Sequence, residues 1–107
     1  MACDSKTRIG AGTVAKFGVT IEPIGSASAE DMDFLIRCYV HPGTYEEVPK
    51  KNMIAEADGS FTFFVNTSRL GEGDLKARVI IYVPDGQAPD NVRKEEAVFD
   101  MGAYIYR

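Results

Sequence analysis

Apolar and polar residues alternate along most of the chain, and the clearest alternation runs over residues 31–40. The apolar face of this segment comprises Met32, Phe34, Ile36, Cys38 and Val40. A helix would scatter these residues around its circumference, whereas successive side chains of a strand point to opposite faces. The segment is therefore predicted to be a strand. It ends before Pro42, because proline cannot donate a backbone hydrogen bond to a sheet.

Further segments repeat this period of two, and turn residues separate them. They are residues 14–22, 52–57, 60–66, 75–83 and a stretch within 93–105. The Asp58-Gly59 dipeptide predicts a hairpin with a type I′ turn, because that turn needs positive φ at both central residues. Gly102 is expected to form a bulge or kink in the last strand. The predicted core consists of Met32, Phe34, Ile36, Val40, Phe61, Phe63, Val65, Leu75, Val79, Ile81 and Val83.

Short strands separated by turns, with no helical segment longer than one turn, indicate an all-β fold. We predict an antiparallel Ig-like β-sandwich of about six to seven strands over residues 14–107. Residues 1–13 are small and polar, and Ile9 is their only sizeable aliphatic anchor besides Met1. This segment is expected to be an extended N-terminal arm, because it has too few apolar groups to form a core of its own.

The composition is that of one soluble domain and excludes several classes of protein. The chain has 107 residues, of which 45% are hydrophobic, and its net charge is −4. An acidic chain argues against binding to nucleic-acid phosphates, which normally needs a basic face. No apolar run approaches the length that crosses a bilayer, and no secretory signal is visible at the N-terminus. Two cysteines are too few for a disulfide-stapled scaffold.

No motif in the sequence points to catalysis, a metal or a bound cofactor. Residues 10–15, GAGTVA, formally match the dinucleotide fingerprint, but that motif needs a strand before it and a helix after it. A hinge between arm and body is the better interpretation. His41 has no nucleophile motif beside it and is interpreted as a surface turn residue. Cys38 is expected to be a buried, inert thiol, and the missing secretory signal disfavours a disulfide with Cys3.

Several strands are apolar on both faces, which an isolated sandwich with a polar outer face does not need. The residues opposite the predicted core are Leu35, Tyr39, Phe64, Ile80 and Tyr82. One explanation is that a neighbouring subunit or the N-terminal arm covers a second surface. The other is that the strand registers slip by one residue, which would move every side chain to the opposite face. On the first explanation these five residues, together with Ile9 of the arm, form an interface.

The order of these motifs resembles small β-sandwich structural proteins of tailed bacteriophages, namely head-fibre and upper-baseplate N-terminal modules and capsid auxiliary proteins. The resemblance covers roughly residues 32–105. It is carried by the segments Asp33-Phe34-Leu35-Ile36, Asp58-Gly59-Ser60-Phe61-Thr62-Phe63, Leu70-Gly71-Glu72-Gly73-Asp74-Leu75 and Pro84-Asp85. The resemblance implies a piece that docks on the virion, because no distal receptor-binding domain follows.

We therefore expect a non-enzymatic virion structural protein, most of all a capsid auxiliary or decoration protein or a fibre-base adaptor. Its partners would be capsid, portal or fibre subunits on a repeating lattice or further copies of itself, with no nucleic acid, membrane or cofactor. It would be found in the virion, and in the host cytoplasm before assembly. A carbohydrate- or surface-binding module is the alternative, although the chain has five tyrosines and no tryptophan for an aromatic platform. A small enzyme is the third reading.

Overall fold

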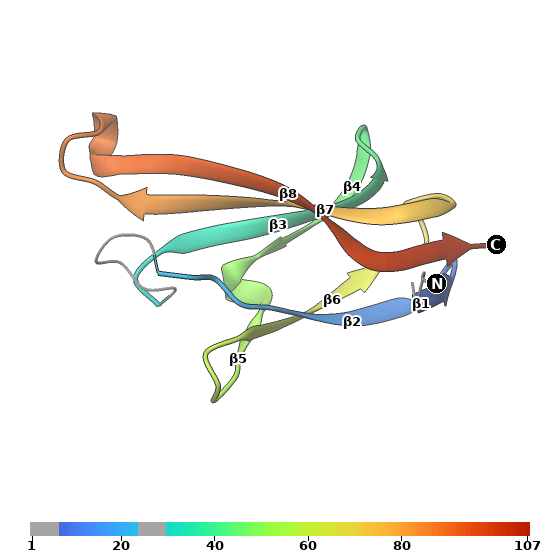
Figure 1. Ribbon diagram of the computed structural model, residues 1–107. Helices are drawn as coiled ribbons and strands as arrows, with labels where there is room; N and C mark the ends of the chain where they lie inside the picture. The colour runs from blue at the N-terminus through green and yellow to red at the C-terminus, as the bar shows by residue number, and fades with distance from the viewer. Residues whose placement is uncertain (1–6, 24–29) are drawn as a thin grey trace, which may run out of the picture.

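The computed structural model describes residues 7–23 and 30–107, and these form two β-sheets that pack against each other (Figure 1). In spatial order, the five-stranded sheet contains β1 (Thr7–Gly10), β8 (Val92–Tyr106), β7 (Gly73–Pro84), β3 (Asp33–His41) and β4 (Thr44–Pro49). The three-stranded sheet contains β2 (Val14–Val19), β6 (Phe61–Asn66) and β5 (Ile54–Ala55). Short 3₁₀ turns occupy Lys50–Asn52 (η1) and Pro89–Asn91 (η2). The predicted all-β class is confirmed.

Strand β1 differs from the predicted arm. It pairs in parallel with the end of β8, from Thr7 opposite Ala103 to Gly10 opposite Tyr106. Ile9 is buried in the core, so residues 7–10 belong to the folded sheet and the all-antiparallel expectation fails at this pair. The physical reason is that residues 103–106 of β8 have a free side to which a strand can pair. Backbone hydrogen bonds to this side and the burial of Ile9 together stabilise β1. Residues 1–6 of the expected arm lie outside the described residues.

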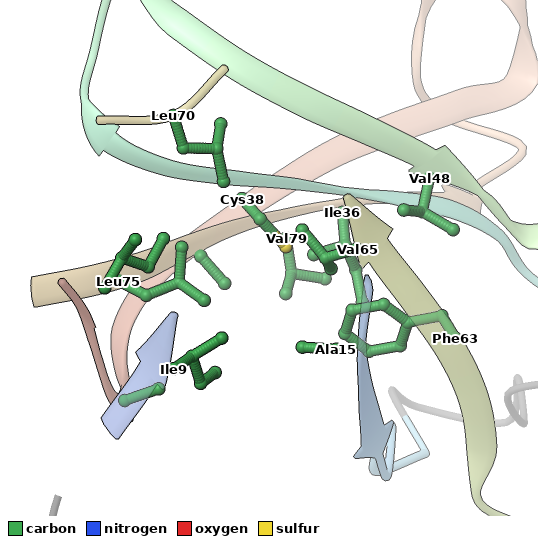
Figure 2. Packing of buried hydrophobic residues seen from close by; sticks show 13 residues of the cluster. Ile9, Ala15, Ile36, Cys38, Val48, Phe63, Val65, Leu70, Leu75 and Val79 are labelled. Atoms are coloured by element: carbon green, nitrogen blue, oxygen red, sulfur yellow. The ribbon is translucent and has the colours of Figure 1, made fainter. Parts of the chain in front are cut away.

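The core lies between the two sheets and follows the predicted alternation. Figure 2 shows Phe63, Val65 and Ala15 of the three-stranded sheet packed toward Ile36 and Val79 of the five-stranded sheet. Phe34 and Phe61 meet edge to face, with their ring centroids 5.1 Å apart. The predicted core residues are buried, except that Val40 and Ile81 are only partly buried. This burial also shows that the strand registers have not slipped by one residue.

The hairpin between β5 and β6 is confirmed, but its turn is not of type I′. Only Gly59 has a positive φ, of 91°, and Asp58 does not. The Asp58 carboxylate accepts hydrogen bonds from the backbone N–H and the hydroxyl of Ser60, at 2.9 and 2.6 Å. This local bonding keeps the aspartate out of the left-handed region and leaves the positive φ to glycine, as in the longer hairpin loops.

A bulge interrupts β8 where it was predicted. Leu75 of β7 lies opposite Ala103, but Lys76 lies opposite Asp100, so Met101 and Gly102 are inserted without partners on β7. Gly102 has a φ of 70°, which glycine adopts without steric cost. Two inserted residues preserve the alternation of faces, so β8 stays in one sheet on both sides of the bulge.

The turn between β1 and β2 contains the glycine-rich segment that resembles a dinucleotide fingerprint. Thr67, which is fully buried and directly follows β6, fixes this turn. Its hydroxyl donates to the carbonyl oxygen of Thr13 at 2.8 Å and accepts from the backbone N–H of Gly12 at 3.1 Å. The segment is thus a tight turn between two strands, without the following helix that a phosphate-binding motif needs.

Candidate interaction surface on strand β8 and the outer sheet face

The outer face of the five-stranded sheet is the side turned away from the core. Four of the six predicted interface residues lie on this face. Leu35 of β3 and Ile80 of β7 are directly opposite each other, and Tyr82 and Tyr39 follow at even spacing along the same two strands. The structure therefore brings Leu35, Ile80 and Tyr82 together as cross-strand and same-strand neighbours, whereas Arg37 separates Tyr39 from Leu35 along β3.

Neighbouring side chains of the same sheet already cover part of this apolar region. Ile80 is only 2% exposed. It lies on a central strand between Leu35 of β3 and Glu96 of β8, and Arg78 and Tyr82 flank it along β7. Long side chains at such positions cover apolar neighbours with their own stems and rings. The burial of Ile80 therefore needs no second subunit, and the interface role of the predicted residues stays a prediction.

The remaining two predicted interface residues lie elsewhere. Ile9 is buried between the sheets. Phe64 is 49% exposed on the outer face of the three-stranded sheet, opposite Lys16 of β2. The six residues consequently do not form one continuous surface. Sequence alternation cannot show this, because it assigns each residue to a face of its own strand and says nothing of which strands become neighbours.

Charged side chains lie beside the apolar residues of the outer face. The guanidinium of Arg37 donates to the Glu47 carboxylate at 2.9 Å and lies 4.8 Å from the centre of the Tyr45 ring. The hydrogen bond to Glu47 raises the pKa of Arg37. Arg78, directly opposite Arg37 on β7, lies 3.9 Å from Glu96. Carboxylates thus balance both arginines, and these exposed pairs add little to stability.

A small hollow opens between these side chains. Its volume is about 190 Å³, and it is lined by Arg37, Tyr39, Pro42, Tyr45 and Arg78. Ligand pockets for small molecules usually enclose roughly 300 Å³ or more. The hollow is therefore smaller than a usual pocket for a small-molecule ligand.

The feature that the sequence did not reveal is the open side of β8. Residues Val92–Phe99 pair with β7 on one side. On the other side, β1 pairs only with residues 103–106, so within the described parts of the chain nothing pairs with Val92–Phe99 there. We call Val92–Phe99 the β8 edge. In Figure 1 the β7–β8 hairpin extends to the left, away from β1 and the C-terminus.

Both charged and apolar side chains occupy the β8 edge. Val92 and Val98 lie on the outer face and Phe99 on the inner face, and all three are exposed. Arg93 hydrogen-bonds to the carboxylates of Asp85 and Glu95. The Arg-Lys-Glu-Glu run breaks the apolar alternation, and for this reason the sequence places the last strand only within a broad range.

Two of the residues considered for chemistry, Cys38 and His41, lie in different surroundings on β3. Cys38 is fully buried, and burial, aided by Glu46, raises its pKa to about 12, so its thiol stays protonated at neutral pH. His41 is exposed at the end of β3. In the ranges 7–23 and 30–107, no three His, Cys, Asp or Glu side chains lie close enough together to hold a metal ion. Cys3 lies outside the described residues.

Comparisons with known proteins do not place the chain in a family. No family model matches it, and neither the curated proteins nor the solved structures searched contain a significant match. Over the part of the chain that the structure describes, no helix has the length and apolar character needed to span a membrane.

Proposed function

We propose that the protein is a non-enzymatic structural protein that docks its β-sandwich onto other protein subunits through β8 and the outer sheet face. The observation that carries this proposal is the β8 edge, where Val92, Val98 and Phe99 are exposed beside an unpaired strand side. Exposed apolar residues along an unpaired strand edge are typical of surfaces that bind protein. The resemblance to tailed-phage proteins supports the more specific role of a capsid auxiliary or decoration protein or a fibre-base adaptor.

The mechanism would be attachment without turnover. A partner strand would pair with the backbone of β8, and its side chains would cover the exposed apolar groups. Completing the burial of a half-exposed valine or phenylalanine contributes about 1 kcal/mol each. A single contact of this kind is weak, but many copies on a repeating lattice multiply its effect through high local concentration. The virion, with the host cytoplasm before assembly, is the location that this role implies.

The Ig-like class belongs to the same proposal. Ig-like domains pack two sheets of seven to nine short strands in total. The five- and three-stranded sheets of this chain are consistent with that size. Binding residues of such sandwiches commonly lie on loops that the rigid sheets position.

The test is to determine whether the protein is bound to particles or free. Lysates of cells that produce the protein would be separated on a density gradient and each fraction probed for the chain. We expect the protein to sediment with particles. Val98→Glu should reduce the particle-bound fraction at least about tenfold, because a charge would have to be desolvated in the contact.

Val14→Glu is the matched control, because Val14 is 58% exposed on the opposite sheet and Val98 is 54% exposed. This variant should remain particle-bound. A wild-type protein that stays at the top of the gradient would refute the virion role. Equal incorporation of the two variants would refute docking through β8.

A further inference from the structure

We infer that the partner of the β8 edge is a second copy of the same chain, paired antiparallel so that two five-stranded sheets join into one. This inference rests on the proposed docking role of β8 and names its partner. The observations that carry it are the length of the unpaired side and the order of charges along it.

The backbone of the β8 edge provides a template for a strand. Alternate N–H and C=O groups of Val92–Phe99 point away from β7, because neighbouring residues in a strand direct their backbone groups to opposite sides. Among the described residues, no strand pairs with these backbone groups. Open edges of this length pair readily with another strand unless something blocks them.

Symmetry restricts how two copies of β8 can pair. A two-fold axis perpendicular to the sheet makes the strands antiparallel and keeps the outer faces of both copies on the same side. Outer-face residues then meet outer-face residues. With Glu95 on the axis, Lys94 of each copy lies opposite Glu96 of the other, and Val92 lies opposite Val98. The outer-face residues on either side of Glu95 are thus complementary to themselves when read in the reverse direction.

The neighbouring registers are less favourable. A shift of the axis to Lys94 or to Glu96 places that residue opposite its own copy, and it replaces the outer-face Lys94–Glu96 and Val92–Val98 pairs by Val92–Glu96 or by Lys94–Val98 pairs. The Lys94 register would also place Arg93 opposite Glu95, but these two side chains are already hydrogen-bonded within one chain. In the proposed register Glu95 meets its own copy, but its carboxylate is already hydrogen-bonded to Arg93 on the same face. The second Arg93 lies on the diagonal, so two arginines balance two glutamates at the axis.

Charged residues on an edge strand can also prevent pairing with another strand. The order of the charges distinguishes an edge that blocks pairing from an edge that pairs with its own copy. A blocking edge needs charge of any sign in any order. A self-pairing edge needs the Lys94 and Glu96 positions to be opposite in sign, which predicts a specific pattern of loss and recovery when the signs are exchanged.

The experiment measures the mass of the purified full chain by sedimentation equilibrium, at low salt and at concentrations up to about 1 mM, which detects even weak dimers. Wild type is expected to show a concentration-dependent dimer. Lys94→Glu and Glu96→Lys should each weaken the dimer about tenfold, because each replaces two attractive pairs by two repulsive ones. Lys16→Glu makes the same charge change on the other sheet and should leave the dimer unchanged.

Mixing the two single variants is the decisive step. In the mixed dimer, Glu at position 94 of one copy faces Lys at position 96 of the other, and Glu96 of the first faces Lys94 of the second. The mixture should recover wild-type dimerisation, although each variant alone dimerises about tenfold more weakly than wild type. Circular dichroism melting checks that each variant is folded. This control is needed because Glu96 lies 3.9 Å from Arg78 of the same chain, so Glu96→Lys also removes an ion pair within the monomer.

Three results would overturn the inference. They are a wild-type chain that stays monomeric over this range, single variants that dimerise like wild type, and a mixture that does not recover. A monomeric chain that still attaches to particles would leave the proposed function intact and reject only the second copy as its partner. A chain that dimerises but never attaches to particles would reject the proposed function and keep the second copy as the partner of the β8 edge.

Discussion

Replacing Ile9 by alanine tests whether β1 belongs to the folded domain. Ile9 is buried in the shared core, with Ala103 and Ile105 of β8 in the same cluster. The substitution removes three carbon groups, each contributing about 0.8 kcal/mol when buried, and the cavity left behind adds to this loss. We expect the free energy of unfolding to fall by about 3 kcal/mol, and the melting temperature to fall by more than about 10 °C.

The assay is urea unfolding followed by circular dichroism, with the melting temperature as a second measure. Ile54→Ala is the matched control, because Ile54 is 53% exposed and the chemical change is identical. It should cost less than about 1 kcal/mol. If both variants are equally stable, β1 adds nothing to the fold, and residues 7–13 behave as the free arm that the sequence predicted.

Three further predictions follow from neighbouring features. Phe63→Ala should lower the free energy of unfolding by about 3–5 kcal/mol, whereas Phe64→Ala, on the opposite face, should cost less than about 1 kcal/mol in the same urea assay. Hydrogen bonds from Ser60 lower the pKa of Asp58, so its stabilising effect is present above the unfolded pKa and is lost as the pH falls through the lowered value. The urea midpoint of Asp58→Ala should therefore fall less on acidification than that of wild type; an equal fall would contradict this. In a Cys3→Ser background, Cys38 should resist thiol reagents at pH 8 until urea unfolds the chain, and rapid labelling of the native protein would show that the thiol is accessible.

The core was predictable because its residues alternate without interruption. In β3 and β7 the side chains on one face are apolar at nearly every second position, and burial on that face follows directly. The Gly102 bulge was predictable for a different reason, since an isolated glycine in a strand pattern marks a place where the backbone departs from regular pairing.

Strands β4 and β1 were not predictable, because they lie at the sheet edges. In β4 only Val48 is buried, and the tyrosine and glutamates before it give no period of two. In β1 the single buried residue is Ile9. An edge strand is held largely by backbone hydrogen bonds, which any sequence without proline can make, so it leaves little trace in the pattern of side chains.

The candidate site was only partly predictable for a related reason. The apolar outer residues of β3 and β7 were identified, but their partial cover by long neighbours depends on which strands pair. The open side of β8 depends on where β1 stops pairing. Both are properties of sheet order, which a single strand's sequence does not contain.

The parallel pairing of β1 with β8 has a consequence for how the chain folds during synthesis. It joins residues near the two ends of the sequence, and such distant contacts form slowly because the chain between them must be ordered first. On the ribosome, β1 is made before β8 and lacks its pairing partner until residues 103–106 emerge. A nascent chain that stalls before β8 leaves both β1 and the far side of β7 unpaired. We therefore expect stalled chains, or chains truncated before β8, to aggregate through these unpaired strand edges.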